Sequence, residues 1–171
     1  QRPGVAGPHR LPLPRRGLIA AWERSLGPTP RRADVIHAPT MLVPPARGSR
    51  LVVTVHDAVP WTHPETLTAR GATWHRAMAE RIARDAAAIA VPTQAVADEL
   101  AQVSVFAGRT FDVLGAGVSP ALLAPPPPGA GAELPERFLL TLATLEPRKG
   151  LDDLVAALAL VGPGAPPLLV V

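Results

Sequence analysis

The sequence predicts an α/β fold built on a parallel sheet, and two observations lead to that prediction. Short apolar runs alternate along the chain with longer segments whose apolar residues have helical spacing. In addition, the run LVVTV at 51–55 is apolar at successive positions, which is typical of a parallel strand covered on both faces. Such alternation implies right-handed β-α-β units, and ligands bind such sheets at the carboxyl ends of the strands.

The first two thirds of the chain contain the predicted elements of one sheet. Strands are expected at 33–38, 51–55, 87–91 and 111–114, and helices at 17–26, at 66–85 and after Thr93. In the helix 66–85, the residues Trp74, Met78 and Ile82 recur every four positions and so share a face. Leu18, Trp22 and Leu26 are expected on one face of the first helix, and Thr93 can cap the last one.

The segment 123–136 interrupts the alternation of strands and helices. Four consecutive prolines followed by Gly and Ala residues are typical either of a long surface loop or of a connector between domains. We favour a connector, because a new strand–loop–helix pattern begins directly after it. The predicted organisation is a partial first domain at 1–122, a linker at 123–136 and the start of a second domain at 137–171.

In that second pattern an apolar run at 138–142 leads through a polar loop into a helix that opens at Gly150. The apolar face of the helix is predicted from the i, i+3, i+4, i+7 spacing of Leu151, Leu154, Val155 and Leu158. Arg148 and Lys149, which is the only lysine of the chain, lie just before the helix start, where positive charge is disfavoured. A bound anion such as a phosphate would explain the two cations. The alternative is that they pair on the surface with the two acidic residues of the first turn, Asp152 and Asp153.

Polar residues lie at the carboxyl ends of three of the predicted strands, which is the place where a ligand site is expected. They are His37, His56 with Asp57, and Arg148 with Lys149. Other histidines have a simpler interpretation. His9 and His75 are expected on the surface, and His63 is expected in a loop with local hydrogen bonds. The same structural role is the alternative to a ligand-binding role for His37. No spacing of His and acidic residues matches a known metal motif, so we predict no metal site.

Composition excludes several classes of protein. The net charge is only +3, aromatic residues make up 4% and no basic run exceeds two residues, which argues against nucleic-acid binding. There is no cysteine, and no apolar stretch is long enough for a membrane span or a signal peptide. Because the chain begins with Gln1 and ends inside an apolar run, we expect it to be an internal piece of a longer protein.

Four segments together resemble the retaining glycosyltransferases of family 4, which have two Rossmann-like domains in the GT-B arrangement. The segments are HAPT at 37–40, VTVHDAVP at 53–60, GAGVSP at 115–120 and LATLEPRKGLDDLVAAL at 142–158. The resemblance implies a GT-B type α/β fold, with most of the N-terminal Rossmann-like domain and the first β-α-β of the C-terminal one. It also implies that the donor's base and ribose pocket, and an acidic motif near the donor sugar, would follow Val171.

The same resemblance implies roles for individual residues. In the family the donor diphosphate lies against the EPRKG loop, so Lys149, Gly150, Arg148 and Thr144 are the expected diphosphate-binding residues. His56 and Asp57 are the expected catalytic residues, with His56 in the position of a histidine near donor sugar and acceptor. Many members carry Gly-Arg where this chain has Ala143 and Thr144.

The activity implied is metal-independent, cofactor-free transfer of a sugar, with retention, from a nucleotide-diphosphate sugar to an acceptor hydroxyl on a sugar or a lipid-linked molecule. The expected location is the cytoplasm, either free in it or at the inner face of the membrane. We expect this chain alone to be inactive. Two alternatives stay open: a non-catalytic GT-B-like protein that binds a ligand or partner, and a nucleotide-sugar epimerase of the same architecture.

Overall fold

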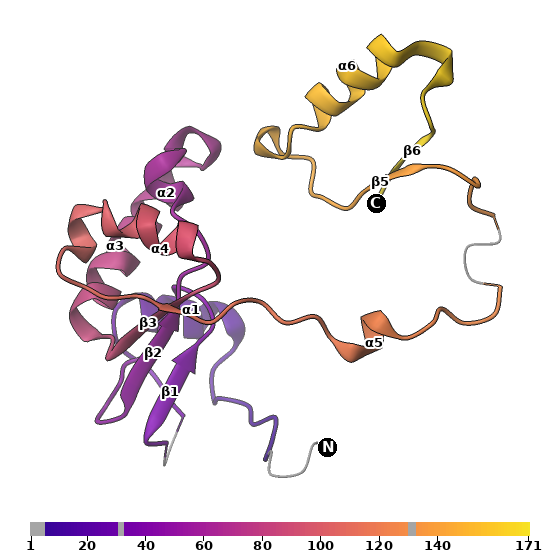
Figure 1. The fold of residues 1–171 in the computed structure, drawn as a ribbon. Helices are drawn as coiled ribbons and strands as arrows, with labels where there is room; N and C mark the ends of the chain where they lie inside the picture. Colours follow the sequence, from indigo (N-terminus) through magenta and orange to yellow (C-terminus); the bar gives the residue numbers. More distant parts are fainter. Residues whose placement is uncertain (1–5, 31–32, 130–132) are drawn as a thin grey trace. The chain divides into compact units, whose positions relative to one another are not determined.

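The computed structural model describes residues 6–30, 33–129 and 133–171, and for Arg148 the main chain alone. The chain divides into two compact units, 1–117 and 118–171 (Figure 1). The predicted domain limits at 122 and 136 stay a prediction, and residues 130–132 of the predicted linker lie outside the described residues.

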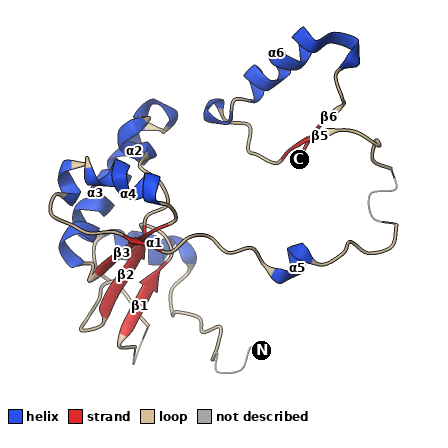
Figure 2. Cartoon of the chain, in the orientation of Figure 1, coloured by secondary structure: helices blue, strands red, loops and turns tan. Residues whose placement is uncertain are grey.

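The first unit is organised around a parallel sheet whose spatial order, β1-β2-β3-β4, follows the chain. Figure 2 shows β1, β2 and β3 of this sheet side by side. The strands are β1 (Val35–Ala38), β2 (Arg50–Thr54), β3 (Ala88–Val91) and β4 (Asp112–Val113). Because every connection moves one step in the same direction, right-handed crossovers place all the connecting segments on one face of the sheet. The predicted α/β class with a parallel sheet is therefore confirmed, although the connection from β1 to β2 contains no helix.

Four α-helices accompany this sheet in the described residues: α1 (Arg15–Glu23), α2 (Val59–Thr62), α3 (Ala69–Asp85) and α4 (Gln94–Ala101). A 3₁₀ turn at Pro64–Thr66 lies between α2 and α3, and a second one at Ser104–Phe106 follows α4. The Thr68 hydroxyl accepts a hydrogen bond from the Gly71 amide at 3.0 Å and so caps α3, which begins three residues later than predicted. Thr93 caps α4 in the same way, as predicted.

The first helix ends earlier than predicted. Its C-cap is Arg24, and Ser25 and Gly27 then take positive φ angles of 58° and 89°, which turn the chain away from the helix axis. Leu26 consequently lies outside the helix and is 58% exposed, so the predicted face that included it is wrong.

The core lies on one face of the sheet. Ile36, Leu51, Val53, Ile89 and Val91 project to that face and are at most 6% exposed. Helix residues cover them, together with Met41 and Val43 from the β1–β2 connection; the main ones are Met78, Ile82, Leu100 and Phe106. On the opposite face Val52 and Thr54 are half-buried and Val35 is 54% exposed. On this face of the neighbouring strand Ala90 is 1% exposed, so the second face of β2 is partly covered. The prediction that both faces of β2 are covered therefore holds in full only for the core face.

The second unit contains a parallel β-α-β segment, as predicted. Its elements are α5 (Pro120–Leu123), β5 (Leu139–Thr141), a 3₁₀ turn (Pro147–Lys149), α6 (Leu151–Val161), a second 3₁₀ turn (Gly162–Gly164) and β6 (Leu168–Val170). Of the predicted helix face, Leu151, Leu154 and Leu158 are half-buried, whereas Val155 is 53% exposed. None of the residues described in this unit is fully buried, so its apolar side chains form only a thin layer between helix and strands.

A buried arginine joins α1 to α3 in the first unit. Arg81 is 5% exposed, and its Nη1 donates a hydrogen bond to the carbonyl of Trp22 near the end of α1. Its Nε lies 3.7 Å from a carboxylate oxygen of Asp85 and has no hydrogen-bond partner among the described residues. Burial lowers the pKa of the Arg81 guanidinium, and the nearby Asp85 carboxylate opposes that shift.

We predict that Arg81→Ala lowers the free energy of unfolding by about 2–3 kcal/mol, because it removes a buried charge-assisted hydrogen bond and leaves a gap between the helices. Arg84→Ala is the matched control, since Arg84 contacts the same Asp85 from the surface and its loss should change stability little. Urea unfolding followed by tryptophan fluorescence measures both, because all three tryptophans of the chain lie in the first unit. Equal losses in the two variants would contradict a structural role for the buried contact.

Candidate functional site

The carboxyl ends of β1 and β2 form the part of the sheet where sequence analysis placed a ligand site. The two strands pair in register up to Ala38 and Val53, so the residues that follow them emerge side by side. His56 is exposed just beyond β2, and its Nε2 lies 2.8 Å from the carbonyl oxygen of Pro39. The structure thus brings a histidine ring of one connection against the main chain of the other.

Asp57, the second residue expected to be catalytic, lies at the start of α2. Its Oδ1 accepts a hydrogen bond from the Val59 amide at 3.1 Å, an Asx-type contact that helps to begin the helix. The helix is held in turn by Trp61, whose ring meets Phe106 edge-on with centroids 5.9 Å apart. The observed contact of Asp57 therefore orients the loop after His56.

His37 lies within β1, on the exposed face of the sheet, one residue before the strand ends. Its Nε2 is 2.8 Å from the hydroxyl of Thr54 on the neighbouring strand. The register pairs His37 with Val52, so this contact is a diagonal one between side chains on the same face. No hydrogen bond joins His37 to His56 in the described residues, although both belong to the same end of the sheet.

The remaining histidines have local partners or lie on the surface. The Nδ1 atom of His63 is 3.0 Å from the Thr62 hydroxyl, and that of His75 is 2.7 Å from the Gly71 carbonyl. His75 also meets Trp74 edge-on, with ring centroids 4.8 Å apart, and is half-buried rather than on the surface. His9 is exposed. These environments agree with structural roles for His63 and His75.

The second candidate site is the loop between β5 and α6 of the second unit. Lys149 ends the 3₁₀ turn and Gly150 forms the N-cap of α6 with φ 64°, a left-handed conformation that favours glycine. Within the described residues, no side-chain hydrogen bond caps the start of this helix. The Lys149 ammonium is exposed and makes no ion pair with Asp152 or Asp153 in the described part of the chain. The alternative in which Lys149 pairs with these carboxylates is therefore not what the structure shows, whereas the Arg148 side chain lies outside the described residues.

Thr144 is engaged within the loop. Its hydroxyl donates to a carboxylate oxygen of Glu146 at 2.7 Å, and the Glu146 amide donates to the Thr144 carbonyl at 2.8 Å. A small hollow of about 340 Å³ lies beside this turn, lined by Leu145, Glu146, Pro147, Leu151 and Asp152. The loop thus has a defined turn geometry, with the Thr144 hydroxyl proton directed to Glu146.

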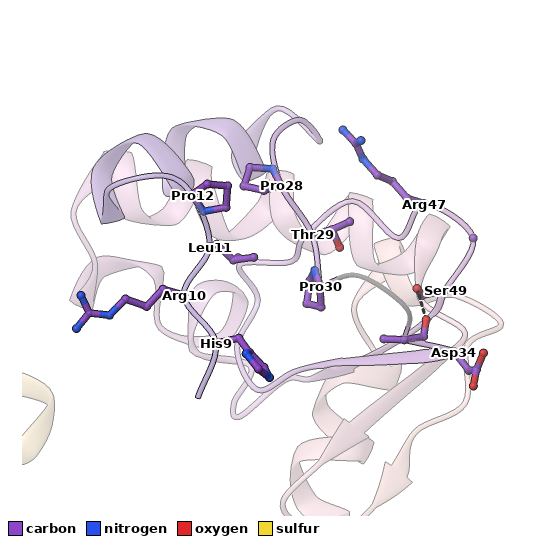
Figure 3. A pocket seen from close by; sticks show the side chains of 12 residues that line it. His9, Arg10, Leu11, Pro12, Pro28, Thr29, Pro30, Asp34, Arg47 and Ser49 are labelled. Carbon is purple, nitrogen blue, oxygen red and sulfur yellow. Dashed lines mark hydrogen bonds between the residues drawn. The ribbon is translucent and has the colours of Figure 1, made fainter. Parts of the chain in front are cut away.

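A larger hollow of about 1100 Å³ lies at the opposite, amino edge of the sheet in the first unit. It is lined by residues 9–12, 28–30, 33–34 and 47–49, of which 34 and 49 directly precede β1 and β2. Figure 3 shows Arg10 and Arg47 well apart, with side chains that extend in different directions. Because its charged groups do not converge, we do not assign a ligand to this hollow.

Two other predicted features concern metal binding and membrane spans. Among the described residues, no group of three or more His, Asp or Glu side chains is placed to hold a metal ion. No helix there is both long and apolar enough to cross a membrane. Metal independence of the reaction stays a prediction.

The Pro39 carbonyl, which is the partner of His56, and the Thr54 hydroxyl, which is the partner of His37, were not predicted from the sequence. The first is a main-chain atom and leaves no signal in the sequence. The second could have been found from register, because Thr54 is two residues beyond the position that pairs with His37.

The fold and the position of these polar groups define a Rossmann-like α/β protein with a candidate ligand site at the carboxyl edge of its parallel sheet. The model of one known family, Glycosyltransferase Family 4, matches residues 1–122, and the chain belongs to this family. The first unit is accordingly of the kind that forms the N-terminal Rossmann-like domain of GT-B glycosyltransferases. No curated protein sequence matches the chain.

Proposed function

We propose that this protein is a glycosyltransferase that moves a sugar from a nucleotide-diphosphate sugar to an acceptor hydroxyl, with retention and without a metal ion. Membership of Glycosyltransferase Family 4 supports the class of reaction and is the observation that carries the proposal. We further propose a cytoplasmic enzyme whose acceptor is a sugar or a lipid-linked molecule, with peripheral contact to the inner face of the membrane.

The donor diphosphate is proposed to bind at the loop before α6. Lys149 supplies a full positive charge, and the uncapped first turn of α6 supplies N–H groups and the positive end of the helix dipole. Asp152 and Asp153 would repel an anion there, but both are exposed, so water and salt screen that repulsion. As the bond to the sugar breaks, charge develops on the leaving diphosphate, and preorganised positive groups stabilise it.

His56 is proposed to act at the reacting sugar, where the resemblance places a histidine near donor and acceptor. Its main chain is held firmly, since Val55 before it and Ala58 after it are both 0% exposed. The ring itself is exposed and is free to meet a substrate on one side. A rigid backbone with an exposed polar ring is what a transition-state contact requires.

We predict that Lys149→Ala in the full-length gene product weakens binding of the nucleoside diphosphate by about 1.5–3 kcal/mol, the size of a charge-assisted hydrogen bond. Binding of the bare nucleoside should hardly change. Calorimetry with both ligands at two salt concentrations separates the phosphate contribution from that of base and ribose. Arg137→Ala, which removes an exposed cation elsewhere in the same unit, is the matched control. If Lys149→Ala and wild type bind the diphosphate equally, the donor-site assignment fails.

We also predict that His56→Ala lowers kcat by about 10²-fold or more with little change in melting temperature, because its contact is made at the reacting centre. His63→Ala is the control: it removes another exposed histidine, located in the loop after α2, and should leave kcat unchanged. A well-folded His56→Ala enzyme with normal kcat would contradict the proposed role of His56 at the reacting sugar and would indicate a structural role.

A second candidate is a non-catalytic protein that binds a nucleotide sugar or a partner without turnover. The observation that favours it is the pair Ala143–Thr144, which stands where many members of the family carry Gly-Arg. Tight binding of a nucleoside diphosphate by the full-length gene product, with no sugar transfer to any acceptor, would support this candidate over the enzyme.

A further inference from the structure

The hydrogen bond between His56 and Pro39 decides which ring nitrogen of His56 carries the proton. The Nε2 atom lies 2.8 Å from the Pro39 carbonyl oxygen, and a carbonyl oxygen can only accept. In neutral His56 the hydrogen therefore resides on Nε2, and Nδ1 is left with a lone pair. No hydrogen bond to Nδ1 occurs within the described residues.

Both partners of this contact are held in place by their surroundings. Proline restricts the φ angle at position 39, which limits the direction of its carbonyl. The preceding Ala38 is 4% exposed and pairs with Val53, and Met41 and Val43 after it are buried in the core. On the side of His56, the Val55 amide donates to the Ala90 carbonyl at 2.9 Å. The main chain on both sides of the contact is thus held by packing, and the exposed His56 ring reaches the Pro39 carbonyl from that fixed main chain.

We propose that the Pro39 carbonyl fixes His56 in the Nε2–H tautomer, so that Nδ1 accepts a hydrogen bond from a hydroxyl of the bound sugar. Pro39 is then a positioning residue that acts through the histidine ring. The tautomer follows from the contact alone, whereas the identity of the Nδ1 partner as a sugar hydroxyl rests on the proposed function.

The chain contains its own references for a test of the tautomer. The Nδ1 atom of His75 is 2.7 Å from the Gly71 carbonyl, which by the same reasoning fixes the opposite tautomer, with hydrogen on Nδ1. His37 faces a hydroxyl group, which can donate or accept, so its partner fixes neither form. His9 is exposed and provides a reference signal for an imidazole ring that exchanges between its two tautomers. The chain has five histidines in all, so each can be assigned with one substitution.

The first experiment is long-range ¹H–¹⁵N NMR of the histidine-labelled chain at a pH that keeps imidazoles neutral. We expect the Nε2–H pattern for His56, the Nδ1–H pattern for His75 and averaged signals for His9. In Pro39→Gly, which keeps the carbonyl but frees its direction, the His56 signals should move towards those of His9. An Nδ1–H or averaged pattern for His56 in the wild-type chain would overturn the tautomer assignment, whatever the activity of the protein.

The second experiment compares two isosteric replacements in the full-length gene product. Asn at position 56 places a polar atom near the Nδ1 position, whereas Gln places one near the Nε2 position. If Nδ1 meets the substrate, His56→Asn should retain about tenfold more kcat than His56→Gln, within the usual size of a polar contact at a reacting centre. Equal or reversed kcat values, with the NMR result as expected, would refute the substrate contact while leaving the tautomer in place. Absence of sugar transfer by the wild-type protein, with the NMR result as expected, would instead refute the proposed function.

Discussion

The register between β1 and β2 is the constraint on which the site in the first unit depends. Pairing of Ile36 with Leu51 and of Ala38 with Val53 places the core side chains of both strands on one face. The same pairing ends both strands at one level, which brings Pro39 within hydrogen-bond distance of His56. A slip of one residue would turn the buried side chains towards solvent, so burial of the core specifies the register and, through it, the geometry at the carboxyl edge.

Much of this arrangement could be predicted from the order of apolar segments. The run 51–55 was recognisable as a parallel strand from its β-branched residues, and the cap at Thr93 from its side chain. Coverage of the sheet could not be predicted in the same way, since it depends on the direction of all crossovers together. The end of α1 was misplaced because two positive φ angles at Ser25 and Gly27 overrode the helical spacing of Leu26. The partner of His56 could not be predicted, because it is a main-chain atom brought close only by the fold.

The second unit presents its candidate site in a different way. There the strand–loop–helix pattern could be predicted from the sequence. The left-handed Gly150 between the 3₁₀ turn and α6 places Lys149 at the helix start. What the sequence could not decide was whether Lys149 pairs with the two aspartates of the first turn. In the structure its ammonium has no such pair in the described residues, which leaves its charge available for an anion. The hydrogen bond from the Thr144 hydroxyl to Glu146 could not be predicted from the sequence either, because it depends on how the turn closes.

Sugar transfer with retention is tested most directly by the anomeric configuration of the glycoside that the full-length protein forms. The enzyme would be incubated with a panel of nucleotide-diphosphate sugars and with free and lipid-linked sugar acceptors, without added metal, and followed by ¹H NMR. We expect release of one nucleoside diphosphate for each sugar transferred, with the anomeric configuration of the donor kept in the product. A product of inverted configuration, or release of nucleotide with no glycoside formed, would contradict this expectation.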